Sequence, residues 1–155
     1  MNKIEMFKHM LLATDGSNAA KNAEDYAFNL NATCGMKLTI LHVLDDKLCH
    51  YGKVDTLAPL EARESFISYV IEEQEEASKE IVTALEDKAK AMNATFELKI
   101  QAGEPVEIVT SFANKGSFDV LIIGGKRSKR TRGFKALSFA DKLGSQVDHT
   151  IITVI

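Results

Sequence analysis

Short apolar runs alternate along this chain with longer segments that have helical periodicity. The run at residues 118–123 ends in four consecutive aliphatic residues and leaves no polar face to solvate, which is typical of a buried strand. Residues 7–14, 36–44 and 150–155 are further apolar strands, and residues 94–102 alternate as a strand with a less buried face does. Apolar positions three or four apart predict helices over residues 19–33, 66–92, 105–115 and 137–147.

Helices and strands alternate after the first strand, which predicts a single α/β domain over residues 1–155. We expect a five-stranded parallel sheet with helices on both faces, a three-layer sandwich. Right-handed crossovers and one reversal after the first strand give the strand order 3-2-1-4-5. Residues 45–65 are the least regular segment. They are either an active-site flap or a solvated crossover, with a short helical turn expected around residues 57–63.

Composition and charge narrow the class of protein. The chain is 45% hydrophobic and 26% charged, and its net charge of −3 gives no overall attraction to nucleic acid or anionic lipid. No apolar run approaches the roughly 20 residues that span a bilayer, and the N-terminus lacks a signal-peptide core. Cys34 and Cys49 lack metal-ligand spacing and are either inert or redox sensors. These features predict a soluble, cytoplasmic protein without a membrane partner and without a metal site of its own.

Positive charge is concentrated directly after the buried strand at 118–123. Gly124 and Gly125 come first, then a basic loop, then a helix that opens near Ser138. The loop residues are Lys126, Arg127, Lys129, Arg130, Arg132 and Lys135. Strand, glycine turn, loop and helix start is the arrangement by which α/β proteins hold phosphate at the carboxyl edge of a sheet. The alternative is an ordinary glycine turn followed by a solvated surface loop.

Several stretches, in the right order, resemble the universal stress protein family over nearly the full length. They read HMLLATDGS from His9, LTILHVL from Leu38, AGEPVEIVTSFANKGSFDVLIIGG from Ala102 and SFADKLGSQVDHTIITVI from Ser138. The resemblance implies a Rossmann-like or flavodoxin-like sheet and a role in the stress response. It also implies a homodimer formed through the last strand, Thr150 to Ile155, and ATP binding in one branch of the family.

The ATP-binding branch carries the pattern G-x2-G-x9-G-[ST] after its fourth strand, and this chain matches it only in part. Gly124 matches the first glycine and Ser138 the serine, at unbroken spacing, whereas Arg127 and Leu137 replace the other two glycines. Glycine lets backbone N–H groups approach phosphate closely. Leu137 is therefore expected to displace the phosphates or to force a different loop path. Arg127 and its basic neighbours offer compensating positive charge.

The resemblance implies an adenine-nucleotide site at the carboxyl edge of the sheet. Its expected residues are Ala13 beside the base, Thr14 and Asp15 near the nucleoside, Val43 at the adenine edge, Ile123 and Phe139 as apolar or backbone contacts, and Gly124, Arg127 and Ser138 near the phosphates. Asp15 either accepts hydrogen bonds from ribose or holds Mg²⁺ on the phosphates, or it caps the first helix. His42 is interpreted as a structural residue.

No motif indicates catalysis. The sequence has no HExxH, no GxSxG and no complete GxxxxGK[ST], so we expect no enzyme activity beyond slow, incidental ATP hydrolysis. The first hypothesis is a stress protein that binds ATP or AMP as a regulatory ligand, with Mg²⁺ accompanying ATP. The second is a nucleotide-free stress protein that acts through dimerisation and an unknown protein partner. The third, an anion or nucleic-acid binder using the basic loop alone, is disfavoured because the loop is one short patch on an acidic chain.

Overall fold

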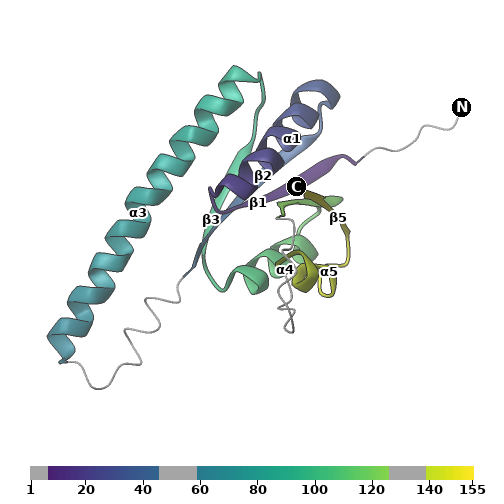
Figure 1. The fold of residues 1–155 in the computed structure, drawn as a ribbon. Coiled ribbons are helices and arrows are strands. Elements are labelled where there is room, and N and C mark those ends of the chain that lie inside the picture. Colours follow the sequence, from purple (N-terminus) through teal and green to yellow (C-terminus); the bar gives the residue numbers. More distant parts are fainter. Residues whose placement is uncertain (1–6, 46–58, 126–138) are drawn as a thin grey trace, which may run out of the picture.

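The computed structural model describes residues 7–45, 59–125 and 139–155 (Figure 1). Strands and helices alternate through these segments, as the hydrophobic pattern predicts. The elements are β1 (His9–Thr14), α1 (Asn18–Cys34), β2 (Lys37–Asp45), α3 (Leu60–Ala91), β3 (Glu97–Gly103), α4 (Pro105–Lys115), β4 (Val120–Gly124), α5 (Phe139–Gly144) and β5 (Thr150–Val154).

The five strands form one parallel sheet of order β3-β2-β1-β4-β5, which confirms the predicted order 3-2-1-4-5. Leu12 in the central strand β1 lies between Ile40 of β2 and Ile122 of β4. Because all the strands are parallel, the carboxyl ends of β1, β2 and β4 meet at one edge of the sheet. The strand order reverses beside β1, where α/β sheets commonly bind ligands.

Two apolar layers cover the sheet, so the predicted three-layer sandwich is confirmed. Side chains alternate between the faces of a strand, and in β1 Met10 and Leu12 point to one face while Leu11 and Ala13 point to the other. The first face packs on α1 and α3, and the second packs on α4 and α5. Figure 1 shows α4 and α5 together on one side of the sheet.

Local sequence signals place the helix ends. Ser17 caps α1 by accepting a hydrogen bond from the Ala20 N–H at 3.3 Å, as expected for a serine after a turn. Gly35 ends α1 in the left-handed conformation, with φ of 68°. Glu104 caps α4, and Pro105 occupies the first turn, where its missing N–H leaves no partner unsatisfied.

Helix α3 starts earlier than predicted, at Leu60 rather than at residue 66. Strong helix formers follow Pro59, so propensity favours a helix there although the segment lacks a core-facing pattern. The first half of α3 runs past the sheet in Figure 1, and Leu60, Phe66, Tyr69 and Ile71 are exposed. Among the described residues, no helix combines the length and apolarity that a bilayer crossing demands.

Other boundaries differ from the predictions by a few residues. Helix α5 ends at Gly144 instead of residue 147, and the N–H groups of Gln146 and Val147 then share the Leu143 carbonyl in a final turn. Strand β3 begins at Glu97 instead of residue 94, since the chain first turns back on α3 through a bond from Ala94 to Ala89. Residues 57–58 of the expected helical turn and the whole basic loop lie outside the described residues.

Candidate functional site

A cavity of about 540 Å³ opens at the carboxyl edge of the sheet, where β1 ends between β2 and β4. Pockets for small ligands in proteins typically measure about 300–1,000 Å³. The end of β1, the start of α1 and the ends of β2, β4 and β5 form the walls together with α4 and α5. Most of the lining side chains are apolar, and polar groups gather at the turn between β1 and α1.

Seven of the residues expected at a nucleotide site line this one cavity. They are Ala13, Thr14, Asp15, Val43, Ile123, Gly124 and Phe139. Arg127 and Ser138 lie outside the described residues. Sequence reasoning had placed the seven at the ends of three separate strands and at one helix start. The parallel sheet brings these ends together.

The cavity also has walls that the sequence analysis missed. One is the first turn of α1, with Ser17, Ala19 and Ala20, and another is the end of β5, with Thr153 and Ile155. The turn from β1 to α1 is short, so the start of α1 necessarily lies at the carboxyl edge of the sheet, and this wall could have been predicted. Thr153 pairs in register with Ile123, a neighbour that only the strand order could have indicated.

The turn after β1 is held by two short-range hydrogen bonds. The Ser17 N–H donates to Asp15 Oδ1 at 2.9 Å, and the Ser17 side chain caps the helix. Ser17 is therefore the cap of α1 and Asp15 is not, so the alternative that Asp15 caps the helix is wrong; Asp15 instead closes an Asx-type turn before it. Among the described residues, the second carboxylate oxygen of Asp15 has no hydrogen-bond partner. The exposed Asp15 carboxylate thus has an oxygen available to a ligand in the cavity.

The Thr14 hydroxyl is already engaged inside the protein. Its Oγ1 donates to Glu24 Oε1 at 2.7 Å and accepts from the Gly16 N–H at 3.2 Å. The carbonyl oxygen of Thr14 lies 3.0 Å from His42 Nδ1, which must donate because a carbonyl can only accept. Thr14 lines the cavity, but its hydroxyl is used inside the protein, where it holds the turn to α1.

The carboxylate that accepts the hydrogen bond from Thr14 is itself buried. Glu24 is almost fully buried, and Lys88 of α3 reaches it at 3.3 Å and reaches Asp25 at 2.9 Å. Burial alone would lower the pKa of Lys88, but the bonds to Asp25 and the charge of Glu24 outweigh it and raise that pKa above its ordinary value. The lysine therefore stays protonated and balances the buried charge.

The sequence predicts a glycine turn at Gly124 and Gly125, but neither residue has the positive φ that such a turn commonly uses. A Cβ on Gly124 would collide with the Ala19 carbonyl oxygen, so this glycine allows β4 to approach the first turn of α1. The Gly125 N–H donates to the Val154 carbonyl at 2.9 Å and extends the sheet. That N–H is consequently not available to phosphate.

Among the described residues, no three or more histidine, cysteine, aspartate or glutamate side chains are grouped so that they could hold a metal ion. A divalent cation at this edge would need ligand oxygens to complete its coordination, because Mg²⁺ in nucleotide sites is usually shared between one or two carboxylates and phosphates. Among the described residues that line the cavity, Asp15 supplies the carboxylate that could take part in binding such a cation.

The strand order and the cavity at the point of reversal define an α/β protein of the Rossmann-like class. The chain belongs to the universal stress protein family, whose family model matches residues 6–154. A search of curated proteins gives no significant match.

Solved structures of the family share this fold at low sequence identity. Universal stress protein UspA from Lactobacillus plantarum is 18% identical with a TM-score of 0.72, over 96% of this chain and 97% of that one. A universal stress protein solved in complex with cAMP is 19% identical with a TM-score of 0.62, over 96% and 97% of the two chains. A universal stress protein from Archaeoglobus fulgidus, solved in complex with dAMP, is 16% identical with a TM-score of 0.61, over 93% and 94%.

Proposed function

We propose that this chain is a stress-response protein that binds an adenine nucleotide, ATP or AMP, in the carboxyl-edge cavity as a regulatory ligand. The observation that carries the proposal is the convergence of seven expected residues, drawn from separate parts of the chain, on one cavity. Two structural neighbours of the same family were solved with cAMP and with dAMP, which supports an adenine nucleotide as the ligand class.

The chemistry of the cavity walls suits a nucleoside. Val43, Val109, Ile123 and Phe139 supply an apolar surface against which a purine ring would pack. The second oxygen of Asp15 would accept hydrogen bonds from ribose hydroxyls. In this proposal the base and the sugar would occupy the part of the cavity between the ends of β1, β2 and β4 and the helices α4 and α5.

The phosphates would then point toward the segment that follows Gly125, which is basic in sequence. Arg127 and Ser138 are the residues expected to contact them. Mg²⁺ would accompany ATP and be held by phosphate oxygens, with Asp15 as a further ligand only if its free oxygen does not bind ribose. The cation would neutralise phosphate charge. The ligand serves as a signal in this proposal, and any hydrolysis of ATP is slow and incidental.

Specific observations favour the alternative of a nucleotide-free protein that acts through a protein partner. Arg127 and Leu137 replace two motif glycines, and the Gly125 N–H is bonded within the sheet. Both features reduce the number of backbone N–H groups that can surround a phosphate. A binding experiment has to separate the two functions.

Thermal unfolding with Mg-ATP, AMP and pyrophosphate tests the proposal. A ligand at 100 times its dissociation constant adds about 2.7 kcal/mol, or roughly 5–10 °C, in a domain of this size. We expect shifts with the nucleotides but not with pyrophosphate, reduced in Asp15→Ala and retained in Asp87→Ala, an exposed aspartate outside the cavity. Equal shifts with pyrophosphate would indicate bare charge attraction. No shift would favour the nucleotide-free function.

The same proposal includes a homodimer formed through the last strand. Strand β5 lies at an edge of the sheet, and an apolar edge strand is usually paired or covered. Antiparallel pairing of two β5 strands across a two-fold axis would satisfy this edge. Light scattering at micromolar concentration should give a dimer, weakened in Ile155→Glu and kept in Ile155→Leu. A monomeric wild-type protein would overturn this part of the proposal.

A further inference from the structure

His42 is buried directly behind the cavity, between two elements that lie far apart in the sequence. The residue is only 4% exposed, and it lines neither the carboxyl-edge cavity nor the pocket between α3 and the sheet. Nδ1 lies 3.0 Å from the Thr14 carbonyl oxygen at the end of β1. Nε2 lies 3.4 Å from the hydroxyl of Ser78 on α3.

The partners of the imidazole ring define its tautomer. A carbonyl oxygen only accepts, so Nδ1 carries a proton. In the neutral ring Nε2 is then an acceptor, and the Ser78 hydroxyl is the donor to it. The 3.4 Å contact is longer than a strong hydrogen bond, so the bond to Thr14 is the stronger of the two.

The bond to Thr14 acts on the part of the chain that forms the polar end of the cavity. The peptide group that carries the Thr14 carbonyl also carries the N–H of Asp15, so a donor on that carbonyl fixes the plane of the peptide group. Glu24 fixes the side chain of Thr14 from the opposite element, α1. His42 and Glu24, which do not line the cavity, therefore fix the backbone from which the Asp15 side chain leaves β1, and the Ser17 N–H holds the carboxylate itself.

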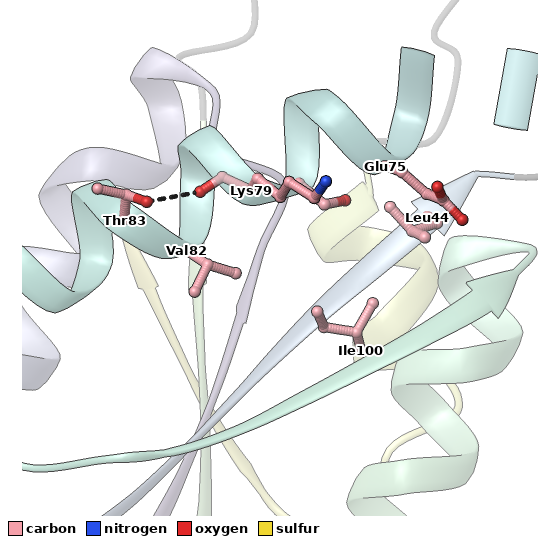
Figure 2. A pocket seen from close by; sticks show the side chains of 7 residues that line it. Leu44, Glu75, Lys79, Val82, Thr83 and Ile100 are labelled. Atoms are coloured by element: carbon pink, nitrogen blue, oxygen red, sulfur yellow. Dashed lines mark hydrogen bonds between the residues drawn. The ribbon is translucent and has the colours of Figure 1, made fainter. Parts of the chain in front are cut away.

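Ser78 extends this connection to α3. It is one of the residues lining a second pocket, of about 390 Å³, between α3 and the strands β2 and β3. Figure 2 shows Val82 and Lys79 on the α3 side of this pocket and Leu44 and Ile100 on the sheet side. Successive hydrogen bonds thus lead from the α3 surface through His42 to Thr14.

We propose that His42 is a positioning residue of the carboxyl-edge cavity: its Nδ1–H orients the Thr14–Asp15 peptide for ligand binding, and Ser78 of α3 supports the tautomer that makes this possible. The inference rests on the proposed adenine-nucleotide function for its affinity readout. A merely structural histidine would act through the volume of its ring. The proposed role instead requires one N–H donor at one position, so a residue that restores the donor should restore binding.

Two substitutions at His42 separate the positioning role from simple packing. The side-chain amide of asparagine can place an N–H near the position of Nδ1, whereas leucine fills similar space without a donor. We expect His42→Leu to weaken Mg-ATP or AMP binding by about tenfold, the effect of one lost hydrogen bond, and His42→Asn to bind within about threefold of wild type. Ser78→Ala keeps the donor and should weaken binding by less than His42→Leu.

Nuclear magnetic resonance supplies two readouts that need no ligand, and the first of them needs no variant. The imidazole ¹⁵N shifts of the ligand-free wild-type protein should show the Nδ1–H tautomer for His42. The backbone amides of Asp15, Gly16 and Ser17 should move in His42→Leu and return toward wild type in His42→Asn. Absence of nucleotide binding with these shifts intact would overturn the proposed function and leave the positioning role standing.

Three results would overturn the positioning role itself. The first is the Nε2–H tautomer in the wild-type protein, which remains decisive if His42→Leu fails to fold. The second is nucleotide affinity in His42→Leu equal to that in wild type. The third is an equal loss in His42→Asn and His42→Leu, which would mean that the ring packs without orienting the peptide.

Discussion

Gly124 at the end of β4 lies against the carbonyl group of Ala19 in the first turn of α1. A Cβ at Gly124 would collide with the carbonyl oxygen and stand 2.8 Å from both the Ala19 carbonyl carbon and the Ala20 Cα. These are backbone atoms, so they cannot move aside as the end of a flexible side chain can. The contact brings α1 to the cavity wall, and its loss should be measurable as stability.

The first prediction is that Gly124→Ala lowers the free energy of unfolding by about 1–3 kcal/mol, because the added methyl group forces β4 and α1 apart. Urea denaturation at 25 °C measures the change. Gly144→Ala is the matched control, since a Cβ there has nothing within 4 Å and alanine suits the helix end at least as well. Equal stability of the two variants would contradict the close-packing role.

The second prediction concerns the two carboxylates that share Lys88. The contact to Asp25 is shorter, 2.9 Å against 3.3 Å, but the Asp25 side chain is 55% exposed whereas that of Glu24 is 7% exposed. Solvent screens the exposed pair, so we expect a coupling energy below about 1 kcal/mol for Asp25–Lys88. For Glu24–Lys88 we expect about 1–3 kcal/mol, because loss of the lysine leaves a buried charge without a counterion.

Double-mutant cycles with Lys88→Met, Glu24→Gln and Asp25→Asn measure both coupling energies in the same background. The Asp25 cycle is the control for the loss of one surface charge. A larger coupling for Asp25 than for Glu24 would mean that distance outweighs burial at this site, contrary to the prediction.

Much of this fold and part of the site could be predicted from the sequence, for identifiable physical reasons. The alternation of apolar runs with helical segments, together with right-handed crossovers, gives the strand order. Ala13, Thr14 and Ile123 come at strand ends, so a parallel sheet necessarily places them at one edge. The resemblance to a family then indicates which edge positions face a ligand.

Contacts between elements could not be predicted in the same way. Nothing local to Gly124 reveals that Ala19 would pack on it, and the pattern suggested a turn instead. His42 was interpreted as a structural residue, and nothing in the sequence indicated its partners Thr14 and Ser78, which are 28 and 36 residues away. A separate helical turn was expected at residues 57–63, but its continuity with α3 was missed, because this exposed segment lacks the apolar periodicity on which the prediction of the long helix relied.

The third prediction is a loss of stability at mildly acidic pH caused by His9. Burial lowers the pKa of His9 from its ordinary value of 6.5, and the charge of nearby Lys37 lowers it further. Below pH 6.5 the unfolded chain therefore binds a proton that the folded chain resists, so stability present above pH 6.5 is lost as pH falls toward the folded pKa. Unfolding free energies at pH 7.5, 6.5 and 5.5 measure the slope.

Two variants assign this slope to His9. His9→Gln cannot titrate, yet it keeps a polar group near the Thr39 hydroxyl, which lies 2.8 Å from the histidine Nε2. It should lose less stability than wild type between pH 7.5 and 5.5. The Phe118 ring covers His9 at a centroid distance of 4.5 Å, so Phe118→Leu should also flatten the slope by exposing the imidazole. Wild-type slopes in both variants would assign the effect to other groups.

The fourth prediction is that the two halves of α3 differ in their contribution to stability. Leu85 in the second half is 2% exposed and belongs to the core on the face of the sheet that α1 and α3 cover, whereas Tyr69 in the first half is 60% exposed. Leu85→Ala should lower the free energy of unfolding by about 2–5 kcal/mol, and Tyr69→Ala should change it by less than about 0.5 kcal/mol. Urea denaturation at a low protein concentration compares them.

The comparison is informative because both residues occupy one continuous helix, so helix propensity cannot explain a difference of this size. What differs is the surface each side chain removes from water: Leu85 fills the space between α3 and the sheet, and Tyr69 lies where α3 runs past it. A loss above about 1 kcal/mol in Tyr69→Ala would contradict the exposed position. If that loss appeared only at high protein concentration, a second copy of the chain would be the surface that covers Tyr69.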